Sequence, residues 1–221
     1  MTLADDLVRT ADSVRSAVPA AIFHAIGRSI GDLQATGTAK RAVGVGARVD
    51  PSPALEHVDG SPFALADVLA GRPAVLVFYR GGWCPYCNVT LRAYAAALPE
   101  IEAAGGTIVA VTPELPENAS KTADANGVGF PIAIDRGNAF SRSLGLVFAL
   151  PEGLRPLYRQ IGIDLAAQNG EDSHELPIPA TYVLDGDGVI RWAFVEADFT
   201  QRADPTHVVR ALKALRDRPA A

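Results

Sequence analysis

The sequence predicts an α/β fold in which a central mixed β-sheet is flanked by helices and preceded by an N-terminal helical extension. Between residues 74 and 134, short apolar segments alternate with helical ones, which is typical of a sheet with helices on its faces. Near the C-terminus, two apolar segments flank an Asp-Gly-Asp-Gly sequence that favours a hairpin turn. The sheet should therefore be parallel at first and end in an antiparallel hairpin.

The N-terminal region has its own pattern. Apolar side chains recur at helical spacing over residues 2–35, with a break at Pro19. The following segment, 36–53, is rich in Gly, Ala and Pro and is expected to be a linker or a surface loop. We therefore divide the chain into an extension with its linker, residues 1–48, and a main domain, residues 49–221.

The main domain is predicted to contain strands and helices in alternation. In chain order these are a strand over 74–79, a helix over 85–104, a strand over 107–112, a helix over 117–126, a strand over 132–134, strands over 180–184 and 189–195, and a helix that begins at Pro205. The stretch 144–179 holds four prolines and one short predicted helix over 152–160. An insertion of this length in a compact domain is more often functional than neutral, because long irregular loops are uncommon.

Composition excludes several classes of protein. With 221 residues, of which 48% are hydrophobic and 20% charged, the chain is expected to fold into a globular structure. A net charge of −5 without a basic cluster argues against a nucleic-acid partner. The apolar segments are shorter than the roughly 18 residues of a membrane span, and the first residues are acidic where a signal peptide is basic. We expect a cytoplasmic protein that binds neither membranes nor nucleic acid.

The two cysteines are the most informative residues. Cys84 and Cys87 follow a Gly-Gly turn at the point where the predicted strand 74–79 passes into a helix. At the amino end of a helix, unpaired N–H groups and the helix dipole stabilise a thiolate and lower its pKa below about 8.5. A spacing of three places both sulfurs on one face of the first turn, close enough for a disulfide, and Pro85 suits that turn. We predict a pair that cycles between dithiol and disulfide.

Two other interpretations of the pair are a half zinc site and a pair of inert core cysteines. Zinc requires about four ligands, and the four histidines are scattered without ligand spacing. We therefore predict redox chemistry, with no metal and no cofactor.

The same segment resembles known families. Residues 83–87, Trp-Cys-Pro-Tyr-Cys, resemble the thioredoxin-fold active site, with the Trp of thioredoxins before the Cys-Pro-Tyr-Cys of glutaredoxins. The longer frame resembles peroxiredoxins of the alkyl hydroperoxide reductase and thiol-specific antioxidant type. Their strand Phe-Tyr-Pro-x-x-x-Thr-x-x-Cys and the helix after it match residues 78–94 without a gap. The resemblance covers most of residues 49–215 and implies a thioredoxin-like fold.

The peroxiredoxin resemblance implies a thiol-dependent peroxidase that reduces hydrogen peroxide or alkyl hydroperoxides. The register places Cys87 at the peroxidatic position, whereas the thioredoxin pattern selects Cys84; we expect Cys87 to attack, because the register covers strand, turn and helix. The sulfenic acid formed would condense with Cys84 to a disulfide. Thioredoxin or a similar thiol reductant would reopen the disulfide. Proteins of this family often form homodimers.

The chain departs from the peroxiredoxin pattern at the site. The family's active-site Thr falls at Cys84 and its Pro at Arg80, and its Arg falls at Pro179, where thioredoxins carry a cis-proline. We expect Pro179 to be cis beside the cysteines and, with Thr181 after it, to position the substrate; an ordinary proline is the alternative. Arg80 either lowers a thiolate pKa in place of the missing Arg or is a solvated surface residue. Trp83 is expected to cover the sulfurs.

Two further functions stay open. The Trp-Cys-Pro-Tyr-Cys sequence and Pro179 also suit a dithiol oxidoreductase that exchanges protein or glutathione disulfides, whereas the whole-chain frame favours the peroxidase. The third is a redox-sensing module that uses the same disulfide as a switch.

Overall fold

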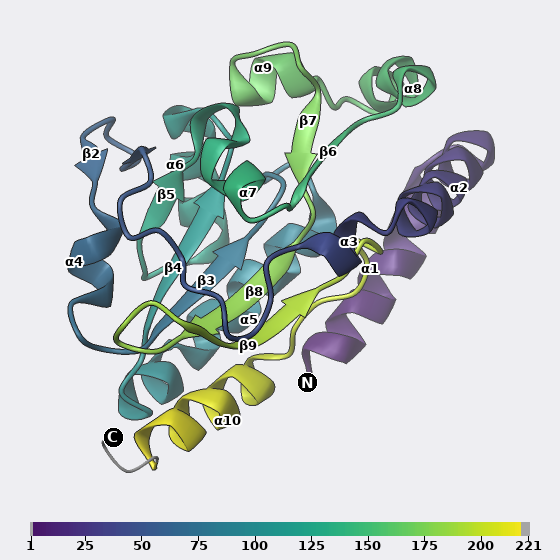
Figure 1. Ribbon diagram of the computed structural model, residues 1–221. Coiled ribbons are helices and arrows are strands. Elements are labelled where there is room, and N and C mark those ends of the chain that lie inside the picture. The colour runs from purple at the N-terminus through teal and green to yellow at the C-terminus, as the bar shows by residue number, and fades with distance from the viewer. Residues whose placement is uncertain (1, 218–221) are drawn as a thin grey trace.

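The computed structural model describes residues 2–217 and contains a seven-stranded sheet with helices on both faces (Figure 1). The helices are α1 (Leu3–Ala17), α2 (Ala20–Thr36), α3 (Thr38–Arg41), α4 (Leu65–Leu69), α5 (Pro85–Ala103), α6 (Pro116–Asn126), η1 (Arg136–Asn138), α7 (Ala139–Ser143), η2 (Glu152–Leu154), α8 (Arg155–Gln160), α9 (Leu165–Asn169) and α10 (Pro205–Arg216). The strands are β1 (Leu55–Glu56), β2 (Pro62–Phe63), β3 (Ala74–Phe78), β4 (Thr107–Thr112), β5 (Ile132–Ile134), β6 (Val147–Ala149), β7 (Glu175–Pro177), β8 (Ala180–Leu184) and β9 (Ile190–Val195).

The order of strands in the main sheet is β2-β1-β5-β4-β3-β8-β9. Strands β3, β4 and β5 are parallel, β8 is antiparallel to β3, and β8 and β9 form a hairpin. The predicted mixed sheet, parallel first and ending in a hairpin, is confirmed. Strands β1 and β2, of two residues each, and the five-residue helix α4 were not predicted, because elements this short show no readable periodicity.

Strand β3 lies in the middle of the sheet, and all five of its residues are buried. Val75 and Val77 face a core cluster with α5, α6 and α10, whereas Leu76 and Phe78 face a second cluster with α4 and α7. A strand covered on both faces is continuously apolar, which explains its sequence. The carboxyl end of β3 is therefore a rigid place from which Arg80 and the Gly-Gly turn emerge.

The N-terminal extension is helical, as predicted, and the break at Pro19 separates α1 from α2. Apolar residues of α1 pack against the α5 side of the core, and Ile26 of α2 packs against a third cluster of buried residues, which are Leu150, Leu154, Tyr158, Leu165 and Leu176. In Figure 1 the two purple helices run along the right side of the molecule, beside α8. The expected linker 36–53 holds the short helix α3 and a bridge between Arg48 and Val189.

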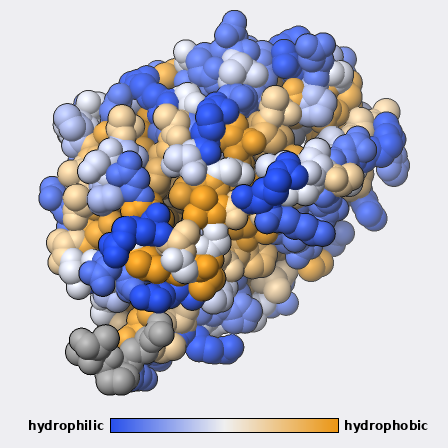
Figure 2. Space-filling model, viewed as in Figure 1, coloured by the Kyte–Doolittle hydropathy of each residue, from blue (hydrophilic) through white to orange (hydrophobic). Residues whose placement is uncertain are grey.

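The insertion 144–179 is more ordered than its prolines indicated. Strands β6 and β7 form a small antiparallel sheet, and η2 and α8 together span the predicted helix 152–160. On the face shown in Figure 2, hydrophilic side chains cover much of α8, α9 and α2, while apolar side chains gather near the centre. None of the helices within residues 2–217 is both long and apolar enough to cross a membrane.

Candidate active site

Both cysteines lie where the sequence predicted, at the amino end of α5. Cys84 is the N-cap residue, Pro85 occupies the first turn, and the Cys87 N–H donates to the Cys84 carbonyl at 3.0 Å. Both thiols are free and fully buried, each with 0% of its surface exposed. The helix dipole and the unpaired N–H groups of the first turn therefore act on these sulfurs without screening by water.

The turn before Cys84 is held by a buried acid. The Gly82 N–H donates to Glu114 Oε1 at 2.8 Å, and the Thr122 hydroxyl donates to Glu114 Oε2 at 3.4 Å. Burial raises the pKa of Glu114, although the hydrogen bond from Gly82 opposes this. A Cβ at Gly82 would lie 2.0 Å from Thr122 Oγ1, so only glycine fits here. No motif marked Glu114 in the sequence.

Arg80 is a buried partner of the first cysteine. Its Nη2 donates to Cys84 Sγ at 3.0 Å, and the residue is 3% exposed. The guanidinium carbon lies 3.8 Å from the ring centroid of Phe199 and 5.0 Å from that of Trp83. The solvated-surface interpretation of Arg80 is therefore wrong, because the side chain is stacked on aromatic rings and aimed at sulfur.

A second arginine reaches the pair from far along the chain. Arg202, in the segment between β9 and α10, places Nη2 at 3.6 Å from Cys87 Sγ, 115 positions away. Arg202 is not among the predicted site residues, because the register with the family places its arginine at Pro179 instead. No local pattern around Arg202 marks it, since its role depends on where β9 and α10 place it.

The pKa values of the two thiols are shifted in opposite directions. Burial opposes ionisation of Cys84, but hydrogen bonding with Cys87 and the charges of Arg80 and Arg202 outweigh it, so the pKa of Cys84 is well below its ordinary value. Burial, the hydrogen bond with Cys84 and the negative charge of Cys84 raise the pKa of Cys87 well above its ordinary value. The pair therefore rests as a Cys84 thiolate beside a Cys87 thiol.

Aromatic side chains surround this charged pair. Trp83 meets Tyr158 of α8 edge to face at 6.0 Å between ring centroids, and Tyr86 meets Phe199 in the same way at 5.9 Å. Trp83 is half-buried against Arg80 and Tyr158. The insertion thus contributes to the site through Tyr158, a residue that the sequence did not single out.

Pro179 and Thr181 lie beside Arg202 in the lining of one small cavity of about 10 Å³. The prediction of a cis-proline is wrong, because the peptide bond before Pro179 is trans. The chain runs extended from β7 to β8 there, with the Ile178 N–H donating to the Leu146 carbonyl at 2.7 Å, and the trans form is the default in such a path. The Thr181 hydroxyl accepts from the Tyr94 hydroxyl at 3.5 Å.

The residues present can carry out two-electron thiol chemistry. A desolvated thiolate held by a cation is a nucleophile, and a neighbouring thiol can close a disulfide with it. Within residues 2–217, no three His, Cys, Asp or Glu side chains are grouped so as to hold a metal ion.

Similarity to known sequences covers much more of the chain than the cysteine motif. Residues 48–193 match the model of the AhpC/TSA family. A protein of Mycobacterium tuberculosis strain H37Rv named "Putative peroxiredoxin Rv2521" is 32% identical over 88 residues, which cover 39% of this chain and 55% of that protein. The chain thus spans about half the length of the curated relatives it matches.

Solved structures share the fold. Peroxidoxin BcpB from Mycobacterium tuberculosis superposes with a TM-score of 0.61 at 18% identity, over 79% of this chain and 99% of that one. Reduced Prx3 from Vibrio vulnificus, in complex with hydrogen peroxide, superposes with a TM-score of 0.62 at 17% identity, over 77% of this chain and 99% of that one.

Proposed function

This chain belongs to the AhpC/TSA family, and from that premise we propose that it is a thiol-dependent peroxidase for hydrogen peroxide or alkyl hydroperoxides. Its thioredoxin-like fold, which it shares with peroxiredoxin structures, places two thiols at one helix end. The observation that carries the proposal is the 3.0 Å contact between Arg80 Nη2 and Cys84 Sγ, with the Cys87 thiol alongside.

Cys84 is the attacking sulfur in this proposal, in place of Cys87, which the register with the family favours. The thiolate attacks one peroxide oxygen, the O–O bond breaks, and the alkoxide or hydroxide leaves and takes a proton from water. Cys84 becomes sulfenic acid. Arg80 stabilises the thiolate before attack and lies beside the oxygens as negative charge moves onto the leaving group.

Cys87 then resolves the sulfenic acid. Its sulfur attacks Cys84 Sγ, water leaves, and the disulfide forms, so that the two electrons given to the peroxide come from the two thiols. Arg202 at 3.6 Å favours the ionised form of Cys87 that this step needs. A cytoplasmic dithiol donor of the thioredoxin type reduces the disulfide by exchange, and the protein acts as a homodimer.

Stopped-flow oxidation of the reduced protein tests the assignment. Wild type should react rapidly with peroxide and form the disulfide. Cys87→Ser should react rapidly but accumulate sulfenic acid that dimedone traps, whereas Cys84→Ser should react slowly, because burial keeps the remaining Cys87 thiol protonated. Rapid sulfenic acid formation in Cys84→Ser and not in Cys87→Ser would transfer the attack to Cys87.

One observation favours a second function, thiol–disulfide exchange. Ionisation at the first cysteine of Trp-Cys-Pro-Tyr-Cys is the distribution that a dithiol reductase needs, because the first sulfur forms the mixed disulfide and the second releases it. Slow reaction with every peroxide, together with rapid reduction of insulin or glutathione disulfide, would establish this function and reject the peroxidase.

A further inference from the structure

Gly82 lies midway between Arg80 and Cys84, and side chains hold both of its polar backbone atoms. Its N–H donates to Glu114 Oε1 at 2.8 Å, and its carbonyl accepts from Asn88 Nδ2 at 2.8 Å. No backbone group of the described chain forms a hydrogen bond with Gly82. The two side chains therefore fix this residue in place of backbone hydrogen bonds. We call Glu114 and Asn88 the Gly82 clamp.

Helix α6 anchors the clamp. The Thr122 hydroxyl donates to Glu114 Oε2 at 3.4 Å, and Asn126 Nδ2 donates to Asn88 Oδ1 at 3.0 Å. Thr122 and Asn126 are both buried and lie one helical turn apart, and Asn126 Nδ2 also donates to the Thr122 carbonyl at 2.8 Å. Arg92 of α5 extends the network, because its Nη1 donates to Asn126 Oδ1 at 2.6 Å. The clamp is thus tied to two packed helices.

The turn needs such support, because two adjacent glycines form a very flexible backbone segment. Close packing requires both of them. A Cβ at Gly81 would overlap Trp83 Nε1, and a Cβ at Gly82 would overlap Thr122 Oγ1. A stiffer residue therefore does not fit at either position, so the rigidity of the turn has to come from outside it.

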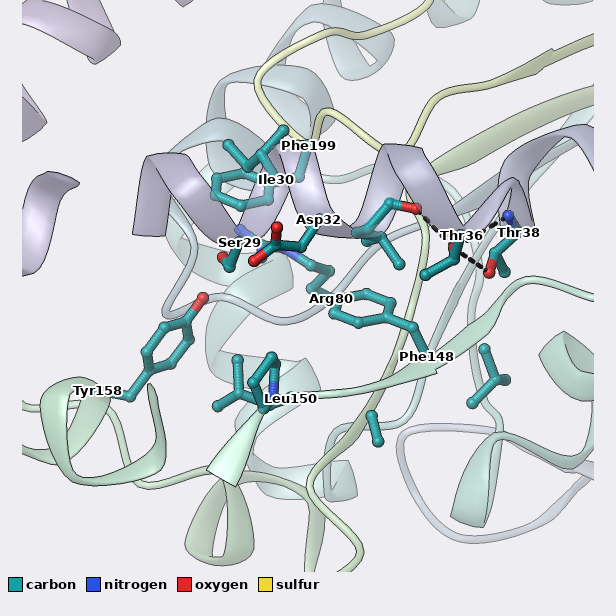
Figure 3. A pocket seen from close by; sticks show the side chains of 14 residues that line it. Ser29, Ile30, Asp32, Thr36, Thr38, Arg80, Phe148, Leu150, Tyr158 and Phe199 are labelled. Atoms are coloured by element: carbon teal, nitrogen blue, oxygen red, sulfur yellow. Dashed lines mark hydrogen bonds between the residues drawn. The ribbon is translucent and has the colours of Figure 1, made fainter. Parts of the chain in front are cut away.

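Packing around Arg80 does not replace the clamp. Arg80 lines a cavity of about 260 Å³, and Figure 3 shows Asp32 of α2 on one side of it and Leu150 and Tyr158 on the other. The buried Nε–H of Arg80 has no acceptor within the described chain. Stacking on the Phe199 ring sets the plane of the guanidinium but not the direction of its N–H groups. The side chain therefore has space into which it can turn when the backbone beneath it relaxes.

We propose that the Gly82 clamp is positioning machinery, which holds the Arg80 guanidinium against the Cys84 sulfur. Neither Glu114 nor Asn88 needs to touch a sulfur, because the turn transmits the restraint. The inference goes beyond the proposed function, since peroxide reduction and disulfide exchange both use the Cys84 thiolate. Its consequence is that the thiolate loses part of its stabilisation when the clamp is removed.

The absorbance of the thiolate, followed against pH in the reduced full-length chain, tests the inference. Glu114→Ala removes the bond to the Gly82 N–H, so the pKa of Cys84 should rise and thiolate absorbance near neutral pH should fall. Glu114→Gln keeps an acceptor oxygen and removes the charge, so its titration curve should match wild type or lie at lower pH. Glu117→Ala, which removes an exposed carboxylate three positions away, is the matched control and should leave the curve unchanged.

A second measurement separates positioning from a merely structural role. In the Arg80→Gln background, Glu114→Ala should cause no further shift of the Cys84 titration, because the group that the clamp positions is already gone. Additive shifts in the double variant overturn the inference. A folded Glu114→Ala variant with the wild-type curve overturns it too. So does a shift of that curve to lower pH, since the carboxylate would then act through its charge.

A substitute covers loss of folding. Where Glu114→Ala does not fold by circular dichroism, Asn88→Ala removes the bond to the Gly82 carbonyl and should shift the titration in the same direction. An unchanged curve in folded Asn88→Ala then overturns the inference. Because no peroxide enters these titrations, the inference can fail while the proposed function holds, and the reverse.

Discussion

Arg80 Nη2 lies 3.0 Å from Cys84 Sγ across a turn of four positions, and both groups are withdrawn from water. The backbone of the segment is anchored on one side by β3 and on the other by α5, and the guanidinium is stacked between the rings of Trp83 and Phe199. In this dry environment the attraction between guanidinium and thiolate is much stronger than in water. Together with the hydrogen bond between the two cysteines, this contact favours the thiolate of Cys84.

Replacing Arg80 by Gln should raise the pKa of Cys84, because a cation beside the sulfur favours its charged form. The ultraviolet absorbance of the thiolate, followed against pH, measures this shift. Arg191→Gln, which removes an arginine paired with Asp185 on the distant hairpin, is the control. An unchanged titration curve would show that Arg80 does not hold the charge on Cys84.

The stability of the reduced protein should depend on pH through the same pair. The pKa of Cys84 is lower in the folded state than in the unfolded state, where it is about 8.5. The contribution of Cys84 to the free energy of unfolding is therefore complete above about pH 8.5 and is lost as pH falls through the folded-state pKa. The pKa of Cys87 is raised, so stability declines again as pH rises above about 8.5. Unfolding free energy should therefore be highest near pH 8.5, with a slope below it of at most about 1.4 kcal/mol per pH unit.

Urea denaturation under reducing conditions checks this profile. Cys84→Ser should remove the rising part and keep the decline above about pH 8.5, because burial alone still raises the pKa of Cys87. If the unfolding free energy of Cys84→Ser still rises with pH as in wild type, groups other than Cys84 cause the rise.

Arg202→Gln should slow disulfide closure more than the attack on peroxide. The Arg202 cation lies 3.6 Å from Cys87 Sγ and favours its ionised form. Without this cation the fraction of Cys87 present as thiolate falls, about tenfold for each unit by which its pKa rises. Sulfenic acid should then persist long enough for dimedone to trap it in a chain with both cysteines. Equal slowing of the two steps would show that Arg202 serves the sulfur pair as a whole.

Gly82→Ala should destabilise the turn before Cys84 by about 1 to 3 kcal/mol, since its Cβ would overlap Thr122 Oγ1. Thr122→Ala in the same chain removes that oxygen and should recover part of the loss. The free energies of unfolding of both single variants and of the double variant form a cycle that measures this coupling. Additive effects would mean that the turn and α6 do not compete for the same space.

Local features of the fold could be predicted from the amino-acid sequence. The alternation of apolar segments located β3, β4, β5 and the final hairpin, because their periodicity depends on burial alone. The Gly-Gly turn, Pro85 and the spacing of the cysteines placed both sulfurs at a helix end, since all of these act within one turn. The short strands β1 and β2 and the small sheet in the insertion could not be predicted, because strands of two or three residues are too short to show a periodic pattern.

The charge state and the surroundings of the thiols depend on tertiary structure. Arg202, Phe199 and Tyr158 come from segments far from the cysteine motif, and nothing near them in the chain points to sulfur. The helices of the extension were predictable from spacing, but their position over Arg80 depends on packing against the insertion. Short-range order thus follows from neighbours along the chain, whereas a sulfur's acidity follows from whichever distant groups the folded chain brings within a few ångströms.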